Sequence, residues 1–104
     1  MVQSFGLITF CLSYFQAKPQ HRDELIRELL KLVEPTRQEP GCIEYELFLD
    51  NKDPNFIILS SKFVNQKALD DHEEKPYVVH FLEGPMAKYC EKVTWNEALE
   101  IKNF

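Results

Sequence analysis

The fold is decided by the stretch Cys42-Ile-Glu-Tyr-Glu-Leu-Phe-Leu-Asp50, Asn51-Lys-Asp-Pro-Asn55, Phe56-Ile-Ile-Leu-Ser-Ser-Lys-Phe63. Residues of the first run alternate in side-chain character with a period of two, which is typical of a β-strand. The second run is apolar on both of its alternating faces, as in a strand covered on two sides. Asn, Asp and Pro between the runs favour a turn. The stretch therefore predicts a β-hairpin.

The segment before this hairpin predicts one strand and one helix. Phe5–Phe15 carries aromatic or aliphatic residues on both alternating faces, the pattern of a strand buried on two sides. From His21 to about Arg37 the apolar residues recur with a helical period. Pro40-Gly41 then ends the helix.

The segment after the hairpin predicts two helices and a last strand. Asn65 is suited to cap a helix over Gln66–Lys75. A further helix is expected over Tyr77–Cys90, dented at Gly84-Pro85. Val93–Ile101 returns to a period of two and predicts a closing strand.

The order β-α-β-β-α-(α)-β is the ferredoxin-like split βαβ pattern, an α+β fold with an antiparallel sheet. Such a sheet carries its helices on one face, yet two of the predicted strands are apolar on both faces. A second surface must cover the other face. The economical cover is the sheet of a second copy related by a twofold axis. The sequence therefore predicts a homodimer through the sheet, a dimeric α+β barrel.

Length and charge narrow the possible partners. A chain of 104 residues and 12.3 kDa is expected to form a single domain spanning residues 1–104. Twelve basic against seventeen acidic residues give a net charge of −5. Without a basic surplus, neither nucleic acid nor an anionic membrane is an expected partner.

The cysteines and the N-terminal segment indicate the compartment. Cys11, Cys42 and Cys90 are scattered and never in a C-x-x-C spacing, which argues against a disulfide framework and a zinc site. The apolar run in the first fifteen residues has no positive charge before it and no small-residue cleavage site after it. It is also shorter than the roughly 20 residues that span a bilayer. We expect a mature chain in the reducing cytoplasm.

No cofactor site is recognisable from the sequence. The three histidines form no H-x-x-x-H pair, and three isolated glycines cannot form a phosphate-binding loop. The sequence also contains no G-x-S-x-G nucleophile elbow. We therefore expect neither a bound metal nor a cofactor.

His72 is the leading candidate for catalysis. On a helical wheel it falls between Ala68 and Leu69, on the face expected to turn toward the sheet. One interpretation is a core histidine whose ring is satisfied by a backbone carbonyl. The other is a general base or hydrogen-bond donor in a pocket between helices and sheet. His21 and His80 are expected to be solvated.

Three aromatic residues are candidates for a pocket wall. Phe63 ends the third strand, and Tyr77 and Phe81 lie on the helix that follows. They are either ordinary core residues or the walls of a pocket for a flat ring.

Two segments carry a resemblance to a known family. They are Ala17-Lys-Pro19 through Pro35-Thr-Arg37-Gln-Glu39-Pro-Gly-Cys42-Ile-Glu-Tyr45-Glu-Leu47, and Phe56 through Ala68-Leu-Asp-Asp-His72 and Lys75-Pro76. Together they resemble the antibiotic biosynthesis monooxygenase (ABM) family across essentially the whole chain, in particular its small stand-alone members such as quinol monooxygenases.

The resemblance implies a ferredoxin-like dimeric α+β barrel and oxygenation of electron-rich aromatics, hydroquinones or polyphenols, with dioxygen and without metal, flavin or haem. His72 stands at the histidine of the family's A-L-D-x-H motif and is the expected catalytic residue. Ser61 and Phe63 stand where family members commonly have E-x-W, and Tyr77 stands where they have the histidine of T-P-H. Ser61, Phe63, Tyr77 and Phe81 are the expected substrate-binding residues.

Two alternative functions remain open at this point. The same small domain supports isomerisation or degradation of small signalling metabolites, with His72 as the base and no consumption of oxygen. A non-catalytic dimer that binds a small apolar ligand is the other alternative, because the E-x-W and T-P-H residues are replaced.

Overall fold

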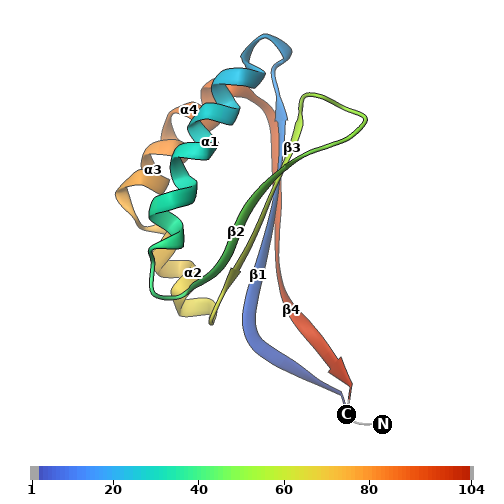
Figure 1. The fold of residues 1–104 in the computed structure, drawn as a ribbon, viewed down its shortest axis with the longest axis vertical. Helices are drawn as coiled ribbons and strands as arrows, with labels where there is room; N and C mark the ends of the chain where they lie inside the picture. Colours follow the sequence, from blue (N-terminus) through green and yellow to red (C-terminus); the bar gives the residue numbers. More distant parts are fainter. Residues whose placement is uncertain (1–2, 104) are drawn as a thin grey trace.

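Four antiparallel strands, with helices packed on one of their faces, make up residues 3–103, the part of the chain that the computed structural model describes (Figure 1). In chain order the elements are β1 (Gln3–Ala17), a 3-10 turn (Pro19–His21), α1 (Arg22–Arg37), β2 (Cys42–Leu49), β3 (Phe56–Phe63), α2 (Gln66–Glu73), α3 (Pro76–Glu83), α4 (Pro85–Tyr89) and β4 (Cys90–Asn103).

The strand order β2-β3-β1-β4 confirms the ferredoxin-like α+β fold. β1 lies in the middle and pairs antiparallel with β3 and with β4, so that Cys11 is opposite Ser61 on one side and Glu97 on the other. β2 and β3 form the expected hairpin. Strands β1 and β4, which are furthest apart in sequence, run side by side and extend beyond the helices (Figure 1).

The prediction of a single dented helix over Tyr77–Cys90 is wrong. The segment forms two helices, α3 and α4, because Gly84 leaves the helical conformation and Pro85 has no N–H to continue the hydrogen-bond ladder. Cys90 belongs to β4 and pairs with Ala17, so the last strand begins earlier than the alternation of Val93–Ile101 indicates.

The main core lies between α1 and the sheet. Leu25, Leu29 and Leu32 are buried on one stripe of α1, as the helical period predicts, and pack against Phe15 and Tyr45. Each such side chain contributes about 1.5–3 kcal/mol by leaving water. This core fixes the helix that leads into the Pro40-Gly41 bend.

Helix α2, which carries His72, is held close to the start of β2. Asn65 caps it as expected, its Oδ1 accepting the Ala68 N–H at 2.9 Å. The backbone of Gly41 accepts the Val64 N–H at 2.9 Å. A Cβ on Gly41 would overlap the Cβ of Ala68, so the close approach of α2 requires glycine at this position.

The other face of the sheet has no helix over it (Figure 1). Apolar, half-buried residues on it include Phe10, Leu12 and Tyr14 of β1 and Ile58 of β3, beside the polar residues Ser60 and Lys62 of β3. This arrangement agrees with the apolar pattern on both faces of these strands.

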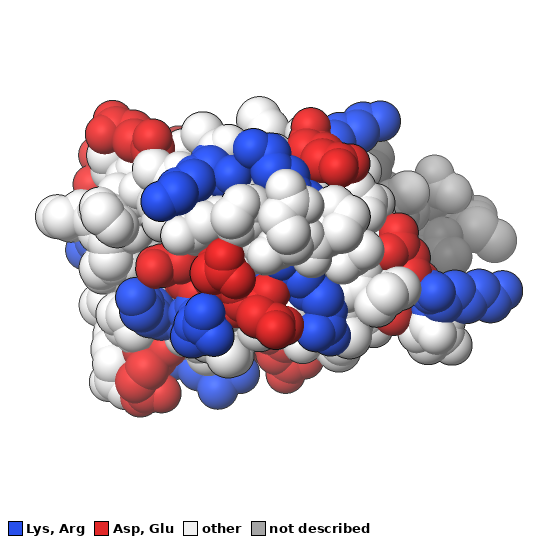
Figure 2. Space-filling model, turned by 90° about the horizontal axis from the view of Figure 1, so that it is seen from above, with Lys and Arg blue, Asp and Glu red and all other residues white. Residues whose placement is uncertain are grey.

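Charged side chains of both signs are interspersed on the end of the molecule shown in Figure 2, where neither sign forms a continuous patch. In the part of the chain that the structure describes, every helix is too short or too polar to cross a bilayer.

Candidate functional site

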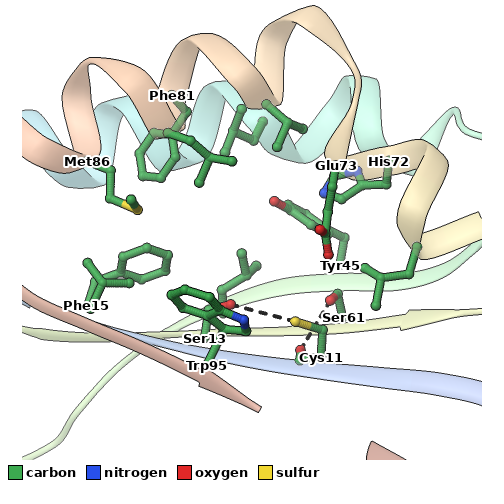
Figure 3. Close-up of a pocket in the computed structure, with 16 residues that line it drawn as sticks. Cys11, Ser13, Phe15, Tyr45, Ser61, His72, Glu73, Phe81, Met86 and Trp95 are labelled. Atoms are coloured by element: carbon green, nitrogen blue, oxygen red, sulfur yellow. Dashed lines mark hydrogen bonds between the residues drawn. The ribbon is translucent and has the colours of Figure 1, made fainter. Parts of the chain in front are cut away.

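A cavity of about 300 Å³ lies between the sheet and helices α2–α4 (Figure 3). Its floor comes from alternate residues of the strands, and its roof comes from the helices. Of the five site residues expected from the sequence, His72, Ser61 and Phe81 line it. Its size and mostly apolar lining suit a small organic molecule.

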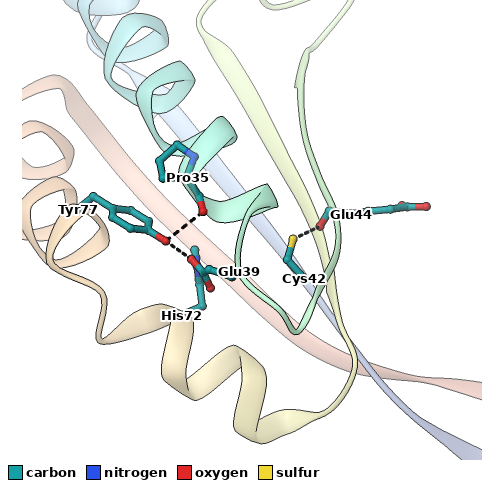
Figure 4. A network of polar contacts seen from close by, with 6 residues as sticks. All are labelled: Pro35, Glu39, Cys42, Glu44, His72 and Tyr77. Carbon is teal, nitrogen blue, oxygen red and sulfur yellow. Dashed lines mark hydrogen bonds and ion pairs between the residues drawn. The ribbon is translucent and has the colours of Figure 1, made fainter.

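The other two expected residues surround His72 instead of lining the cavity. Phe63 is fully buried, and its ring centroid lies 5.0 Å from that of His72. The Tyr77 hydroxyl donates to the carboxylate of Glu39, a residue that itself contacts His72 (Figure 4). His80 is exposed, and His21 pairs with Glu24 at 2.7 Å, so neither lies at the cavity.

His72 is buried, with only 5 % of its surface exposed. Its Nδ1 lies 3.0 Å from Oε2 and 3.3 Å from Oε1 of Glu39, and the Glu39 side chain is equally buried. The partner of the ring is therefore a carboxylate from the loop after α1, and not the backbone carbonyl of the first of the two interpretations. Such a partner fixes both the position of the ring and the nitrogen that carries the proton.

Tyr77 completes this network. Its hydroxyl donates to Oε2 of Glu39 and lies 3.4 Å from the carbonyl oxygen of Pro35. Burial, and after it the hydrogen bond to Glu39, raises the pKa of Tyr77, so the hydroxyl keeps its proton and acts as a donor. The oxygens of an ionised Glu39 can only accept, so both Tyr77 and His72 Nδ1 donate to it.

With Nδ1 protonated, Nε2 of a neutral His72 carries the lone pair. Among residues 6–101, whose side chains the structure describes, Nε2 has no hydrogen-bond partner. Thr36 Oγ1 is the only fully buried side-chain nitrogen or oxygen in this range that lacks a partner. Nε2 of His72, which also lacks one, is therefore not fully buried. His72 lines the cavity, and a neutral imidazole is a group that can accept a proton from a bound molecule.

Tyr45 supplies a second polar group to the cavity. Its ring meets the His72 ring edge to face, with centroids 5.5 Å apart, and its hydroxyl points into the cavity (Figure 3). Burial raises the pKa of Tyr45, which is 2 % exposed. The hydroxyl therefore stays protonated and can donate a hydrogen bond to an oxygen of a bound molecule.

The remaining polar groups lie near the same end of the cavity. Ser61 Oγ donates to the carbonyl oxygen of Cys11 at 3.1 Å. Burial raises the pKa of the Cys11 thiol, which disfavours its thiolate form. Partial burial, and after it the nearby Glu97, raises the pKa of Glu73.

Glu39 and Tyr45 are functional candidates that the sequence analysis did not single out. Both lie in the Glu39-Pro-Gly-Cys42-Ile-Glu-Tyr45 segment that carries the family resemblance. That co-occurrence with the histidine motif is the signal that points to them. Trp95 and Met86, which also line the cavity, carry no comparable signal.

Within residues 3–103, no group of three His, Cys, Asp or Glu side chains is arranged to hold a metal ion.

Known proteins resemble this chain in both sequence and structure. The family model described as "Antibiotic biosynthesis monooxygenase" matches residues 10–84. An uncharacterized Synechocystis protein, sll1783, is 35 % identical over 68 residues, which is 65 % of this chain and 46 % of that protein, so the match spans under half of the relative. "Putative monooxygenase YcnE" of Bacillus subtilis is 29 % identical over 67 % of this chain and 74 % of its own length.

Solved structures agree with this assignment. The crystal structure of SO0527 from Shewanella oneidensis is 27 % identical, has a TM-score of 0.92, and is matched over 96 % of this chain and 98 % of its own. A crystal structure described as an antibiotic biosynthesis monooxygenase is 26 % identical, with a TM-score of 0.78 over 88 % of this chain and 95 % of its own. The family supports a monooxygenase-type function. The family model covers most of the sequence, and the fold agrees with those of the solved structures. The chain therefore belongs to the antibiotic biosynthesis monooxygenase family.

Proposed function

We propose that this protein is a cofactor-independent monooxygenase that oxidises a small electron-rich aromatic, such as a hydroquinone or another phenol, with dioxygen. The observation that carries the proposal is the Glu39–His72 pair at the wall of an apolar cavity, since it leaves Nε2 of His72 free to accept a proton. Family membership supports the reaction type.

His72 starts the proposed reaction by taking the proton of a phenolic hydroxyl at Nε2. The positive charge that forms on the ring is stabilised by Glu39, which accepts from Nδ1. Tyr45 donates a hydrogen bond to the phenolate oxygen and holds the ring of the substrate in place.

The phenolate is then electron-rich enough to reduce dioxygen. It transfers one electron to dioxygen, and the ring radical and superoxide combine to form a C–O bond at a ring carbon. The peroxide takes up the proton held by His72 and loses water together with the hydrogen of that carbon, leaving a carbonyl. One oxygen atom enters the quinone product, the other leaves as water, and the substrate supplies all the electrons.

The proposal includes a homodimer through the open face of the sheet. Phe10, Leu12, Tyr14 and Ile58 on that face are only half-buried in a single chain, so pairing with a second copy removes more of their surface from water. The three cysteines are all unpaired, which supports a location in the reducing cytoplasm.

Oxygen consumption by metal-stripped protein tests the function. A panel of hydroquinones and anthrone-like phenols is offered to the wild type, to His72→Ala and to His80→Ala, a matched control on the exposed side of α3. We expect uptake above the spontaneous rate, reduced about 100-fold or more in His72→Ala and unchanged in His80→Ala. Equal uptake in the first two proteins would remove His72 from the mechanism. Turnover of a substrate without oxygen uptake would instead favour an isomerase.

A further inference from the structure

The cavity is polar at one end and apolar at the other, and the strand register defines its long axis. Cys11, Ser13 and Phe15 of β1 line the floor in succession. Ser61 is opposite Cys11, whereas Val93 is opposite Phe15. Four residues of extended chain separate the two levels by about 13 Å.

The polar end is built around His72. Glu73, Ser61 and Cys11 lie on the same side of the cavity as His72, and the hydroxyl of Tyr45 points inward beside them (Figure 3). A phenolic hydroxyl bound here meets one proton acceptor and one hydrogen-bond donor.

The apolar end lies under α3 and α4. Phe81 and Met86 come from these helices, and they face Phe15 across the cavity, away from His72 (Figure 3). Val93 lies at the level of Phe15, and Leu32 of α1 also lines the cavity; both are hydrocarbon side chains. A substrate that carried a second polar group at this end would lose that group's hydrogen bonds to water without replacement.

We propose that the preferred substrate is an amphipathic phenol or hydroquinone, whose hydroxyl lies at His72 and whose apolar substituent extends from the ring to Met86. An unsubstituted hydroquinone is too short to extend from His72 to Met86, so it leaves the apolar end of the cavity empty. Met86 then determines specificity for the length of the substituent, since its flexible thioether closes this end. The proposal rests on the proposed function for the reaction, although binding can be tested without it.

Trp95 provides a direct readout of binding. It is the only tryptophan of the chain and lines the cavity opposite Ser13, midway between the two ends. A ligand that spans the cavity must pass its indole, so its fluorescence reports occupancy without a label.

The experiment is an anaerobic titration of the protein with phenol and a series of 4-n-alkylphenols, followed by Trp95 fluorescence. We expect the dissociation constant to fall about fourfold with each added methylene, because burial of one methylene contributes about 0.8 kcal/mol to the binding free energy. The trend should end when the alkyl substituent is long enough to reach Met86. An affinity that does not depend on chain length overturns the proposal.

Variants at Met86 locate the effect. Met86→Gln should weaken binding of the longest well-bound alkylphenol at least tenfold and leave phenol itself unaffected. Ile43→Gln, at an exposed apolar position outside the cavity, serves as the matched control and should change neither. If Met86→Gln does not fold, Met86→Ala replaces it and should move the end of the trend to longer chains. An unchanged trend in the folded variant contradicts the role of Met86.

The two proposals can fail separately. The titration excludes oxygen and so measures binding alone. If affinity rises with alkyl length but the separate assay finds no oxygen uptake, the monooxygenase proposal fails and the amphipathic-ligand proposal stands. Oxygen uptake that is equally fast for short and long substituents would do the reverse.

Discussion

Oε2 of Glu39 lies 3.0 Å from Nδ1 of His72, although 33 residues separate the two in the chain. Both side chains are less than 10 % exposed. A histidine that is held in this way needs no reorientation when it accepts a proton, since the carboxylate already faces the charge that forms. In the proposed mechanism, Glu39 is thus a positioning residue for His72.

Replacement of Glu39 by glutamine should lower kcat. Glu39→Gln keeps the shape but removes the negative charge and allows the amide to donate toward Nδ1. We expect kcat to fall about 100-fold with little change in KM, because the substrate does not contact this side chain in the proposed mode. Glu44→Gln, at an ion pair with Lys62 away from the cavity, is the control. A loss confined to KM would contradict the positioning role.

Tyr77 is expected to affect stability more than binding. Tyr77→Phe removes a donor to Glu39 and should reduce the free energy of unfolding by about 1 kcal/mol. Since Tyr77 does not line the cavity, the affinity for alkylphenols should stay the same. Urea denaturation beside the Trp95 titration separates the two quantities. Tyr14→Phe, on the face of the sheet without helices, should change neither.

The approach of α2 to Gly41 can be tested by a double-mutant cycle. Gly41→Ala brings a methyl group against Ala68 and should cost about 2 kcal/mol of unfolding free energy. Ala68→Gly alone should cost about 1 kcal/mol because glycine is unfavourable inside a helix. The double variant should be more stable than the sum of the two losses predicts. Strict additivity in urea denaturation would mean that the two residues do not interact.

Cys90 should resist alkylation at neutral pH. Burial raises the pKa of its thiol to about 11, so the protonated form dominates below that pH. At pH 8 the thiolate population, and with it the iodoacetamide rate, should lie about 100-fold below that of a free thiol. The rate should rise about tenfold per pH unit toward pH 11. Mass spectrometry of peptides alkylated between pH 7 and 10 measures this dependence, and a rate already saturated at pH 8 would contradict it.

The periodicity of the sequence was enough to predict the order of the strands and helices. The leucine stripe of α1 reports directly which face of the helix is buried, whereas β3 is apolar on both faces, so its pattern does not show that Ile57, Leu59 and Phe63 are the buried side. The break at Gly84 was underestimated, because a proline can either kink a helix or end it, and the backbone conformation of the preceding residue decides.

The site was harder to predict than the fold. The wheel of α2 placed His72 toward the sheet, and the structure agrees. Its carboxylate partner comes from a loop, where periodicity carries no information, and the distance between Glu39 and His72 is set only by tertiary packing. The same limit applies to Phe63, whose position at the end of β3 does not reveal that it packs behind His72 in the core.

The pairing of β1 with β4 also has a consequence for folding kinetics. The hairpin and α1 need only contacts that are local in the chain, whereas Phe15 must find Val93 across most of the sequence. Closing so long a loop costs more entropy and is expected to come late in folding. Both residues line the cavity, so the binding site is completed in the last and slowest step, and a chain arrested before it has helices and a hairpin but no place for a ligand.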